Sequence, residues 1–246
     1  MSGAAIDRHT QKRILIIASN SAVSPITQWP VGFWWAEVTH PYHAFIEAGY
    51  EVDIASPQGG DLEGDGFSDP EHESAYSADD LISLGFKKSP NHAPLLKGTP
   101  SIHRLDLDAY DAIMIAGGQG PMVTMIDDAP LHAFVARAYE AGKIVCVICH
   151  ATCVLLRVRL STGELLVTGK TWTGFANSEE DFADSFVNMK IQPFRIEDEA
   201  RKIADTNFIV SKRFDRFAIR DGNLITGQQQ FSGAAAAALV IEALGR

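Results

Sequence analysis

Short uninterrupted runs of apolar residues recur along this chain, and they constrain its fold more than any other feature. Such a run is typical of a strand that is buried on both faces of a sheet. The longest strongly apolar stretch, Ile144 to Cys149, is far shorter than the roughly 20 residues that a membrane-spanning helix needs. The predicted strands lie at residues 13–18, 51–55, 112–116, 143–148 and 208–210.

Helical patterns lie between several of these runs. One helix is predicted from about Val38 to Ala48, stopped by Gly49, with Pro41 in its first turn, where proline is tolerated. A final helix is expected after Ser232, which would cap it. The clearest pattern has apolar residues at spacing i, i+3, i+4 and i+7, acidic N-cap candidates before it and a glycine after it: Leu131, Phe134, Val135 and Ala138, with Asp127, Asp128 and Gly142.

Alternation of strands with helices implies crossover connections. The sequence therefore predicts an α/β fold with a mostly parallel sheet and helices on both faces. We expect one domain over residues 13–246, preceded by a disordered polar leader at 1–12. Residues 57–104 are rich in Gly, Pro, Ser, Asp and His, and are interpreted as an insertion at the sheet edge with one short helix near residues 78–84. That insertion is expected to be a lid, an interface or a surface loop.

Composition excludes several classes of protein. The 246 residues are 46% hydrophobic and 21% charged, which suits a packed core that needs no disulfides, and there are only three cysteines. The net charge of −10 disfavours nucleic-acid binding, which requires a basic face. No signal-peptide or membrane segment is recognisable, so we expect a cytoplasmic protein with reduced thiols and a small-molecule substrate.

Cys149 is the first candidate for chemistry. A predicted strand ends at Ile148 and an apolar helical pattern follows directly, so the thiol is expected at a tight strand-to-helix turn, at the carboxyl edge where open α/β sheets bind ligands. The N–H groups of that helix would stabilise a thiolate. Ala151 is small enough not to crowd the turn. The alternative is an ordinary buried cysteine of the core, and the position alone does not decide between the two.

Other uses of the cysteines are less favoured. Cys146 and Cys149 form a Cys-x-x-Cys pair, but residues three apart on a strand point to opposite faces, which disfavours a redox disulfide. A zinc site that also used His150 and Cys153 is disfavoured because ligands on a strand and a helix would not converge. We therefore interpret Cys146 as a core residue and expect no metal.

A glycine-rich loop follows the predicted strand at 112–116. Its position at the carboxyl edge would let the amides of Gly118 and Gln119 form an oxyanion hole with those after Cys149. The loop lacks the Gly-x-Gly-x-x-Gly spacing of dinucleotide-binding sites, so no dinucleotide cofactor is expected. The alternative interpretation is a tight turn without a ligand.

Carboxylates give the third set of candidates. Glu37, beside Trp34 and Trp35 and before a predicted helix, is either a desolvated proton carrier with a raised pKa or a solvated residue of a first turn. A metal site that combined Glu37 with His40 and His43 is disfavoured by Pro41 and the spacing. The pair Glu179 and Glu180 is ambiguous between helix capping and a site.

Taken in order, these motifs resemble the ThiJ/PfpI superfamily, whose fold is that of class I glutamine amidotransferase domains. The branch that they resemble most is that of glutathione-independent glyoxalases (glyoxalase III) and stress chaperones. The resemblance extends from about residue 13 to the C-terminus. It rests on Glu37 with His40-Pro41, Gly117-Gly118-x-Gly120, Cys149-His150, Thr173-Gly174-Phe175 with Glu179-Glu180, and the segment 221–227.

The resemblance implies a chemistry for each matching residue. Cys149 would attack the aldehyde carbon of an α-oxoaldehyde such as methylglyoxal, and His150 would move protons. Glu180 would orient His150, and Glu37 would hydrogen-bond the sulfur and shuttle a proton between the two substrate carbons. The resemblance further implies cofactor-free turnover, homodimers, and chaperone-like, peptidase or deglycase behaviour.

The sequence departs from the family pattern around the expected site. Gln119 replaces the usual histidine of Gly-Gly-His-Gly, Thr124 replaces an aspartate, and Ala151-Thr152 replaces Gly-Pro. The segment 226–232 also lacks the usual Asn-Pro. These changes are expected to reshape the pocket rather than the fold. The alternatives to the glyoxalase hypothesis are a stress-linked holdase or redox sensor that uses an oxidisable Cys149, and a hydrolase or hydratase for another electrophile.

Overall fold

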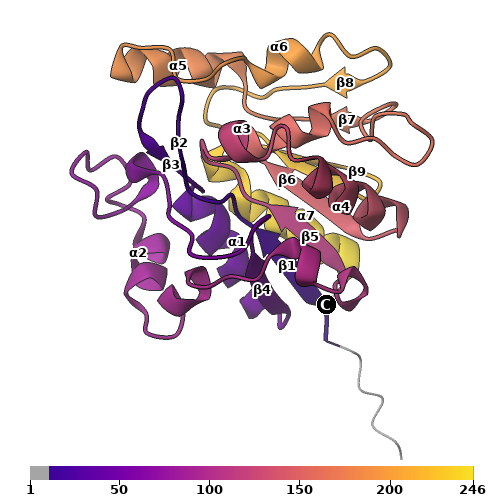
Figure 1. Ribbon diagram of the computed structural model, residues 1–246, viewed down its shortest axis with the longest axis horizontal. Coiled ribbons are helices and arrows are strands. Elements are labelled where there is room, and N and C mark those ends of the chain that lie inside the picture. The colour runs from indigo at the N-terminus through magenta and orange to yellow at the C-terminus, as the bar shows by residue number, and fades with distance from the viewer. Residues whose placement is uncertain (1–10, 246) are drawn as a thin grey trace, which may run out of the picture.

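A six-stranded sheet forms the centre of the molecule, as seen in a computed structural model that describes residues 11–245 (Figure 1). Neighbouring strands are parallel except for the last pair, β10 and β9, which is antiparallel. The predicted mostly parallel α/β sheet is therefore confirmed. In spatial order the strands are β4 (Glu51–Ala55), β1 (Arg13–Ile17), β5 (Ala112–Ile115), β6 (Ile144–Ile148), β10 (Leu224–Gly227) and β9 (Ala218–Asp221).

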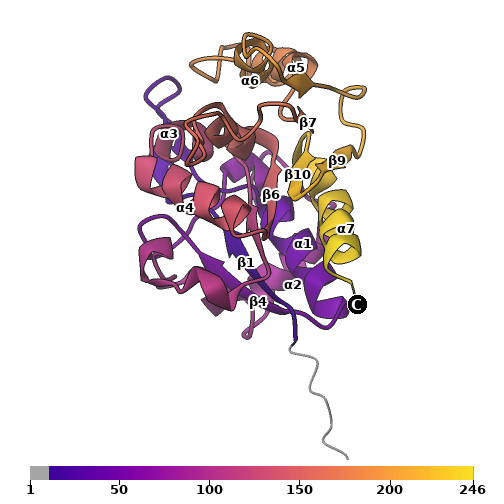
Figure 2. The same ribbon diagram turned by 90° about the vertical axis from the view of Figure 1, so that its right-hand side faces the viewer.

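Helices cover both faces of this sheet. Figure 2 shows α4 and α7 on opposite sides of β6, and α1 packs beside α7. Burial of the central strands on both faces explains their continuous apolar sequence, since every residue of β5 and β6 is buried. The α-helices are α1 (Trp35–Glu47), α2 (Leu81–Lys88), α3 (Pro121–Thr124), α4 (Ala129–Glu140), α5 (Asn177–Val187), α6 (Ile196–Ala200) and α7 (Gly233–Leu244).

Smaller elements surround the sheet. The pairs β2–β3 and β7–β8 form separate two-stranded sheets, and α5 and α6 lie in a layer above the main sheet together with β7 and β8 (Figure 1). No helix in residues 11–245 is both long and apolar enough to cross a membrane. The remaining bounds are β2 (Ala22–Val23), β3 (Pro30–Val31), β7 (Thr171–Trp172) and β8 (Asn207–Phe208), with short 3₁₀ turns at Gly66–Ser68, Ala93–Leu96, Ile102–Arg104, Leu107–Ala109, Cys149–Leu156 and Gln230–Ser232.

The predicted strand at 208–210 is not part of the main sheet. Phe208 pairs with Trp172 in the small β7–β8 sheet, and Val210 is 38% exposed. The place beside β6 is taken instead by β10, whose four residues are all buried. A short apolar run is therefore compatible with an isolated pair as well as with a buried central strand.

Helix α1 begins earlier than predicted. It starts at Trp35, so Glu37 lies in its first turn rather than before it, and Pro41 lies beyond that turn. The cause is tertiary, because the N–H of Trp34 donates to Gly117 O and that of Trp35 to Ser68 Oγ. These bonds satisfy amides that a local cap would otherwise serve.

Two other local predictions need correction. The helix expected at 78–84 is α2, which starts at Leu81 and is capped by the Asp80 carboxylate. Ser232 does precede α7, but its hydroxyl accepts hydrogen bonds from Phe217 N and Gln229 N and not from the helix. The expected leader at 1–12 lies mostly outside the described residues. Lys12, which is described, forms an ion pair with Asp111.

The cap of α4 provides a test of the fold. Asp128 accepts a hydrogen bond from Leu131 N at 2.9 Å, whereas the exposed Asp127 makes no such bond. We predict that Asp128→Ala lowers the free energy of unfolding by about 1 kcal/mol in urea titrations. Asp127→Ala is the matched control and should change it by less than about 0.5 kcal/mol. Equal changes in the free energy of unfolding for the two variants would show that the Asp128 hydrogen bond does not stabilise α4.

Candidate active site

Cys149 occupies a sharp turn at the carboxyl end of β6. Its backbone is left-handed, with φ of +57°, and the Thr152 hydroxyl donates to its carbonyl oxygen at 2.6 Å. A non-glycine residue in this conformation is strained, and such strain is concentrated at functional sites. The segment that follows is a 3₁₀ turn over Cys149–Leu156 rather than a regular α-helix.

A histidine and a carboxylate extend from the sulfur on one side. Cys149 Sγ lies 3.7 Å from His150 Nδ1, and His150 Nε2 lies 3.0 Å from Glu180 Oε1. The imidazole stacks on Phe175 with ring centroids 3.9 Å apart. Because both ring nitrogens and one ring face have fixed neighbours, His150 is held in a single orientation against the sulfur.

Glu37 lies on the other side of the sulfur and is fully buried. Its Oε2 accepts a hydrogen bond from Gly117 N at 2.7 Å. Burial raises the pKa of Glu37 to about 7, although hydrogen bonds from Cys149 and Gly117 favour the charged form. Of the two interpretations of Glu37, the structure supports the desolvated carboxyl in contact with the thiol.

The thiol does not have the lowered pKa that was expected from its position. Burial and the neighbouring Glu37 carboxylate raise the pKa of Cys149, while N–H groups of His150 and Gly118 oppose the rise. Two acids in contact within a buried site resist carrying two negative charges. The sulfur therefore becomes a thiolate most easily when Glu37 carries the proton.

The glycine loop explains how Glu37 and Cys149 approach each other. A Cβ at Gly117 would lie 2.7 Å from both Cys149 Cβ and Glu37 Oε2, so only glycine fits there. Gly118 has φ of +98° and directs its N–H at the sulfur. The prediction does not hold for Gln119, because its N–H donates to Asp65 Oδ2 at 2.6 Å and is not free for an oxyanion.

Asp65 is a site residue that sequence reasoning missed. It comes from the 57–104 segment, is buried, and accepts hydrogen bonds from the N–H groups of Gly32 and Gln119. Burial raises its pKa to about 7. Its carboxylate ties the glycine loop to the segment before α1. The sequence carried no signal for this role, because a Gly-Asp-Gly triplet is typical of surface turns.

The two adjacent glutamates have different roles. Glu179 is structural, because its carboxylate accepts hydrogen bonds from Ala176 N, Phe214 N and Gln228 Nε2. Glu180 contacts His150. Only the second is thus placed to act on the imidazole.

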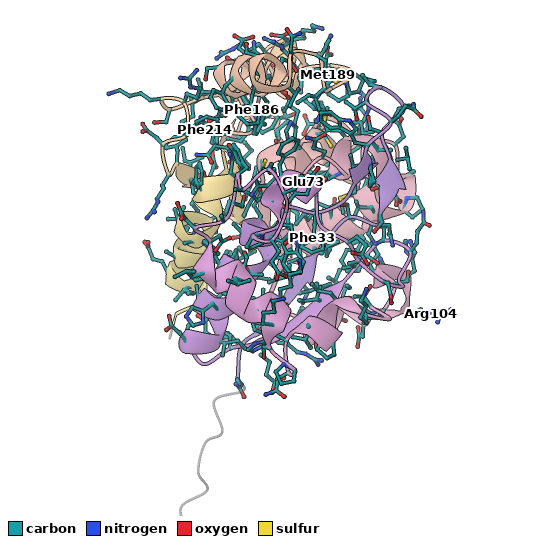
Figure 3. All side chains as sticks on the ribbon, turned by 90° about the vertical axis from the view of Figure 1, so that its left-hand side faces the viewer. Phe33, Glu73, Arg104, Phe186, Met189 and Phe214 are labelled. Carbon is teal, nitrogen blue, oxygen red and sulfur yellow. The ribbon has the colours of Figure 1, made fainter. Side chains whose placement is uncertain are left out.

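A cleft opens above Cys149, His150 and Glu180. The empty space of this cleft, including the space at its mouth that is open to solvent, is about 630 Å³. Gln119 forms part of its wall. Ala151 is fully buried and does not line this cleft. Figure 3 shows Phe186 and Phe214 in the upper part of the molecule, where α5 and the segment before β9 enclose the cleft.

The remaining candidates do not join the site. Cys146 and Cys153 are buried and unbridged. His40 pairs with Asp80 and His43 with Glu47, so neither converges with Glu37. Within residues 11–245 no group of three or more His, Cys, Asp or Glu side chains is arranged to hold a metal ion.

Comparison with known proteins identifies the family of this chain. The model of the DJ-1/PfpI family matches residues 31–243, and the chain belongs to that family. It is 27% identical to the glutathione-independent glyoxalase HSP31 of Saccharomyces cerevisiae, over 95% of this chain and 98% of that protein. It is 26% identical to glyoxalase 3 of Candida albicans, over 86% of this chain and 89% of that protein.

Solved structures show the same fold. Rapid Encystment Protein 24 kDa of Francisella tularensis superposes with a TM-score of 0.84 at 24% identity, covering 96% of this chain and all of that one. Glyoxalase III of Candida albicans superposes with a TM-score of 0.78 at 24% identity, covering 94% and 97% of the two chains.

The environment of the cysteines predicts selective labelling. Cys149 lines the cleft, whereas Cys146 and Cys153 are fully buried and do not line it. We predict that iodoacetamide at pH 8 modifies Cys149 at least tenfold faster than either of the others in the folded protein, as measured by peptide mass spectrometry. Cys153→Ala should label as the wild type does, and Cys149→Ala should remain unlabelled. Similar rates at all three sites would contradict this geometry.

The buried Glu37 also predicts a pH-dependent stability. Its pKa is higher in the folded chain than the ordinary value of 4.5, so ionisation costs stability as the pH rises from about 4.5 through 7. The cost approaches about 3 kcal/mol, at about 1.4 kcal/mol per pKa unit. Glu37→Gln should therefore gain stability relative to the wild type between pH 5 and pH 8 in urea titrations. The exposed Glu73→Gln is the matched control and should show no such gain.

Proposed function

We propose that this protein is a cofactor-free enzyme that converts small α-oxoaldehydes into 2-hydroxy acids. The observation that carries the proposal is the position of Cys149 at the base of a cleft, with Glu37 on one side and the His150–Glu180 pair on the other. The named activity of the yeast relatives, glutathione-independent glyoxalase, supports the same reaction.

The first step is covalent. Glu37 accepts the thiol proton, and the sulfur attacks the aldehyde carbon, forming a C–S bond while the carbonyl electrons move to oxygen. The proton that Glu37 received then passes by way of His150, held by Glu180, to that oxygen, which gives a hemithioacetal and returns Glu37 to its carboxylate form. Because Cys149 supplies the sulfur nucleophile, the reaction needs no glutathione.

The second step moves a proton between carbons. The Glu37 carboxylate removes the proton from the hemithioacetal carbon and returns it to the adjacent carbonyl carbon. The hydroxyl proton of the hemithioacetal moves by way of His150 to the oxygen of that adjacent carbon, which leaves a 2-hydroxy thioester on Cys149. A pKa of about 7 suits a group that takes up and releases a proton near neutrality. Water then cleaves the thioester, releasing the hydroxy acid and regenerating the thiol. The overall change is addition of water, so no external oxidant or reductant is needed.

The family resemblance extends the proposal to the state of the protein in the cell. We expect a single-domain, cytoplasmic homodimer whose partner in the reaction is a small molecule.

Loss of the sulfur tests the proposal. We predict that Cys149→Ala loses at least 10³-fold in kcat for methylglyoxal without glutathione, measured as hydroxy-acid formation. Its far-ultraviolet circular dichroism should match the wild type. Cys146→Ala, the same change on the preceding strand β6, is the control and should retain turnover. Wild-type activity in Cys149→Ala would exclude the covalent mechanism.

A further inference from the structure

The lining of the cleft above Cys149 is more aromatic than a three-carbon aldehyde requires. We propose, building on the proposed function, that the preferred substrates are uncharged α-oxoaldehydes that carry an aromatic ring. The juxtaposition of the nucleophile with a group of rings contributed by separate parts of the chain points to this class.

Seven Phe, Tyr and Trp residues line the cleft, and five of them are here called the aromatic collar. Phe67 and Tyr76 come from the 57–104 segment, Phe182 and Phe186 from α5, and Phe214 from the segment before β9. Ring centroids are 5.7 Å apart for Tyr76 and Phe186, 6.0 Å for Phe67 and Phe186, and 5.0 Å for Phe182 and Phe214. These edge-on or tilted contacts are of the kind that a further ring could join.

One member of the collar is left largely uncovered. Phe186 is 55% exposed although three other collar rings contact it. Burial of apolar surface is favourable, so a ligand ring that covered Phe186 would gain affinity from that contact. Phe186 lies near the C-terminal end of α5, in the upper part of the molecule (Figure 3).

The lining of the cleft favours a substrate larger than methylglyoxal. It extends from Cys149 and His150 to aromatic side chains of separate parts of the chain, among them Phe186. A three-carbon aldehyde would contact Cys149 and His150 and leave the collar unfilled. An aryl group attached to the same dicarbonyl unit would extend from the sulfur toward the collar.

The charges around the cleft exclude an anionic substituent. No Lys or Arg is among the described residues that line it, whereas Glu179 and Glu180 are. Arg213 stacks over the rings of Phe182 and Phe214 without lining the cleft. The other polar side chains of the wall include the neutral amides Gln119, Gln192 and Gln230, which suit an uncharged ligand.

Steady-state kinetics test the proposal. We expect kcat/KM for phenylglyoxal to exceed that for methylglyoxal at least tenfold, and 4-carboxyphenylglyoxal to lose this advantage. Phe186→Ala should reduce the phenylglyoxal-to-methylglyoxal ratio at least fivefold. The control is Leu81→Ala, which removes an apolar side chain that is 72% exposed and does not line the cleft, and it should leave the ratio unchanged. A ratio near one, or a ratio that Phe186→Ala does not alter, would overturn the proposal.

A second measurement separates this inference from the proposed function. Rates of Cys149 modification by N-phenylmaleimide and N-ethylmaleimide, each normalised to its rate with free glutathione, should favour the phenyl reagent at least fivefold, and Phe186→Ala should abolish that preference. If the preference is found but neither aldehyde is converted, the aromatic site stands and the proposed reaction fails. If methylglyoxal is converted but neither preference is found, the reaction stands and the aromatic specificity is wrong.

Discussion

The arrangement of the site depends on one buried carboxyl group. Glu37 is enclosed at the start of α1, where its Oε2 accepts the N–H of Gly117 and its carboxyl group interacts with the thiol of Cys149. This contact joins three segments that follow separate strands of the sheet. A parallel sheet brings such segments to the same edge, and the hydrogen bond from Gly117 sets the distance between them.

That arrangement has a cost in stability. Glu37 and Asp65 are both buried without a cationic partner in hydrogen-bond contact among residues 11–245, and burial raises the pKa of each to about 7. Replacement of either by an apolar side chain would remove the desolvation penalty but would also leave backbone N–H groups without acceptors. The two carboxyls are thus best understood as fixing the geometry of the loop and the protonation of the sulfur, rather than as contributions to stability.

The 57–104 segment contributes both to the glycine loop and to the wall of the cleft. It supplies Asp65 beneath the glycine loop and also Phe67 and Tyr76 at the mouth of the cleft. A segment that is rich in glycine and polar residues therefore determines both the rigidity of the loop and the shape of the entrance. The α5 layer completes the opposite wall through Phe182 and Phe186.

Much of this protein could be predicted from its sequence, because the relevant signals are local. Apolar runs marked β1, β4, β5 and β6, and the position of Cys149 directly after β6 indicated the turn at which the thiol lies. Tertiary structure alone decided the rest. Contacts between residues distant in the chain decide three features of the site. They determine that Glu180 rather than Glu179 contacts His150, and that the Gln119 amide is held by Asp65. They also determine which rings enclose the cleft. Local patterns carry no record of such contacts, because loop closure and side-chain packing, rather than periodicity, select the partners.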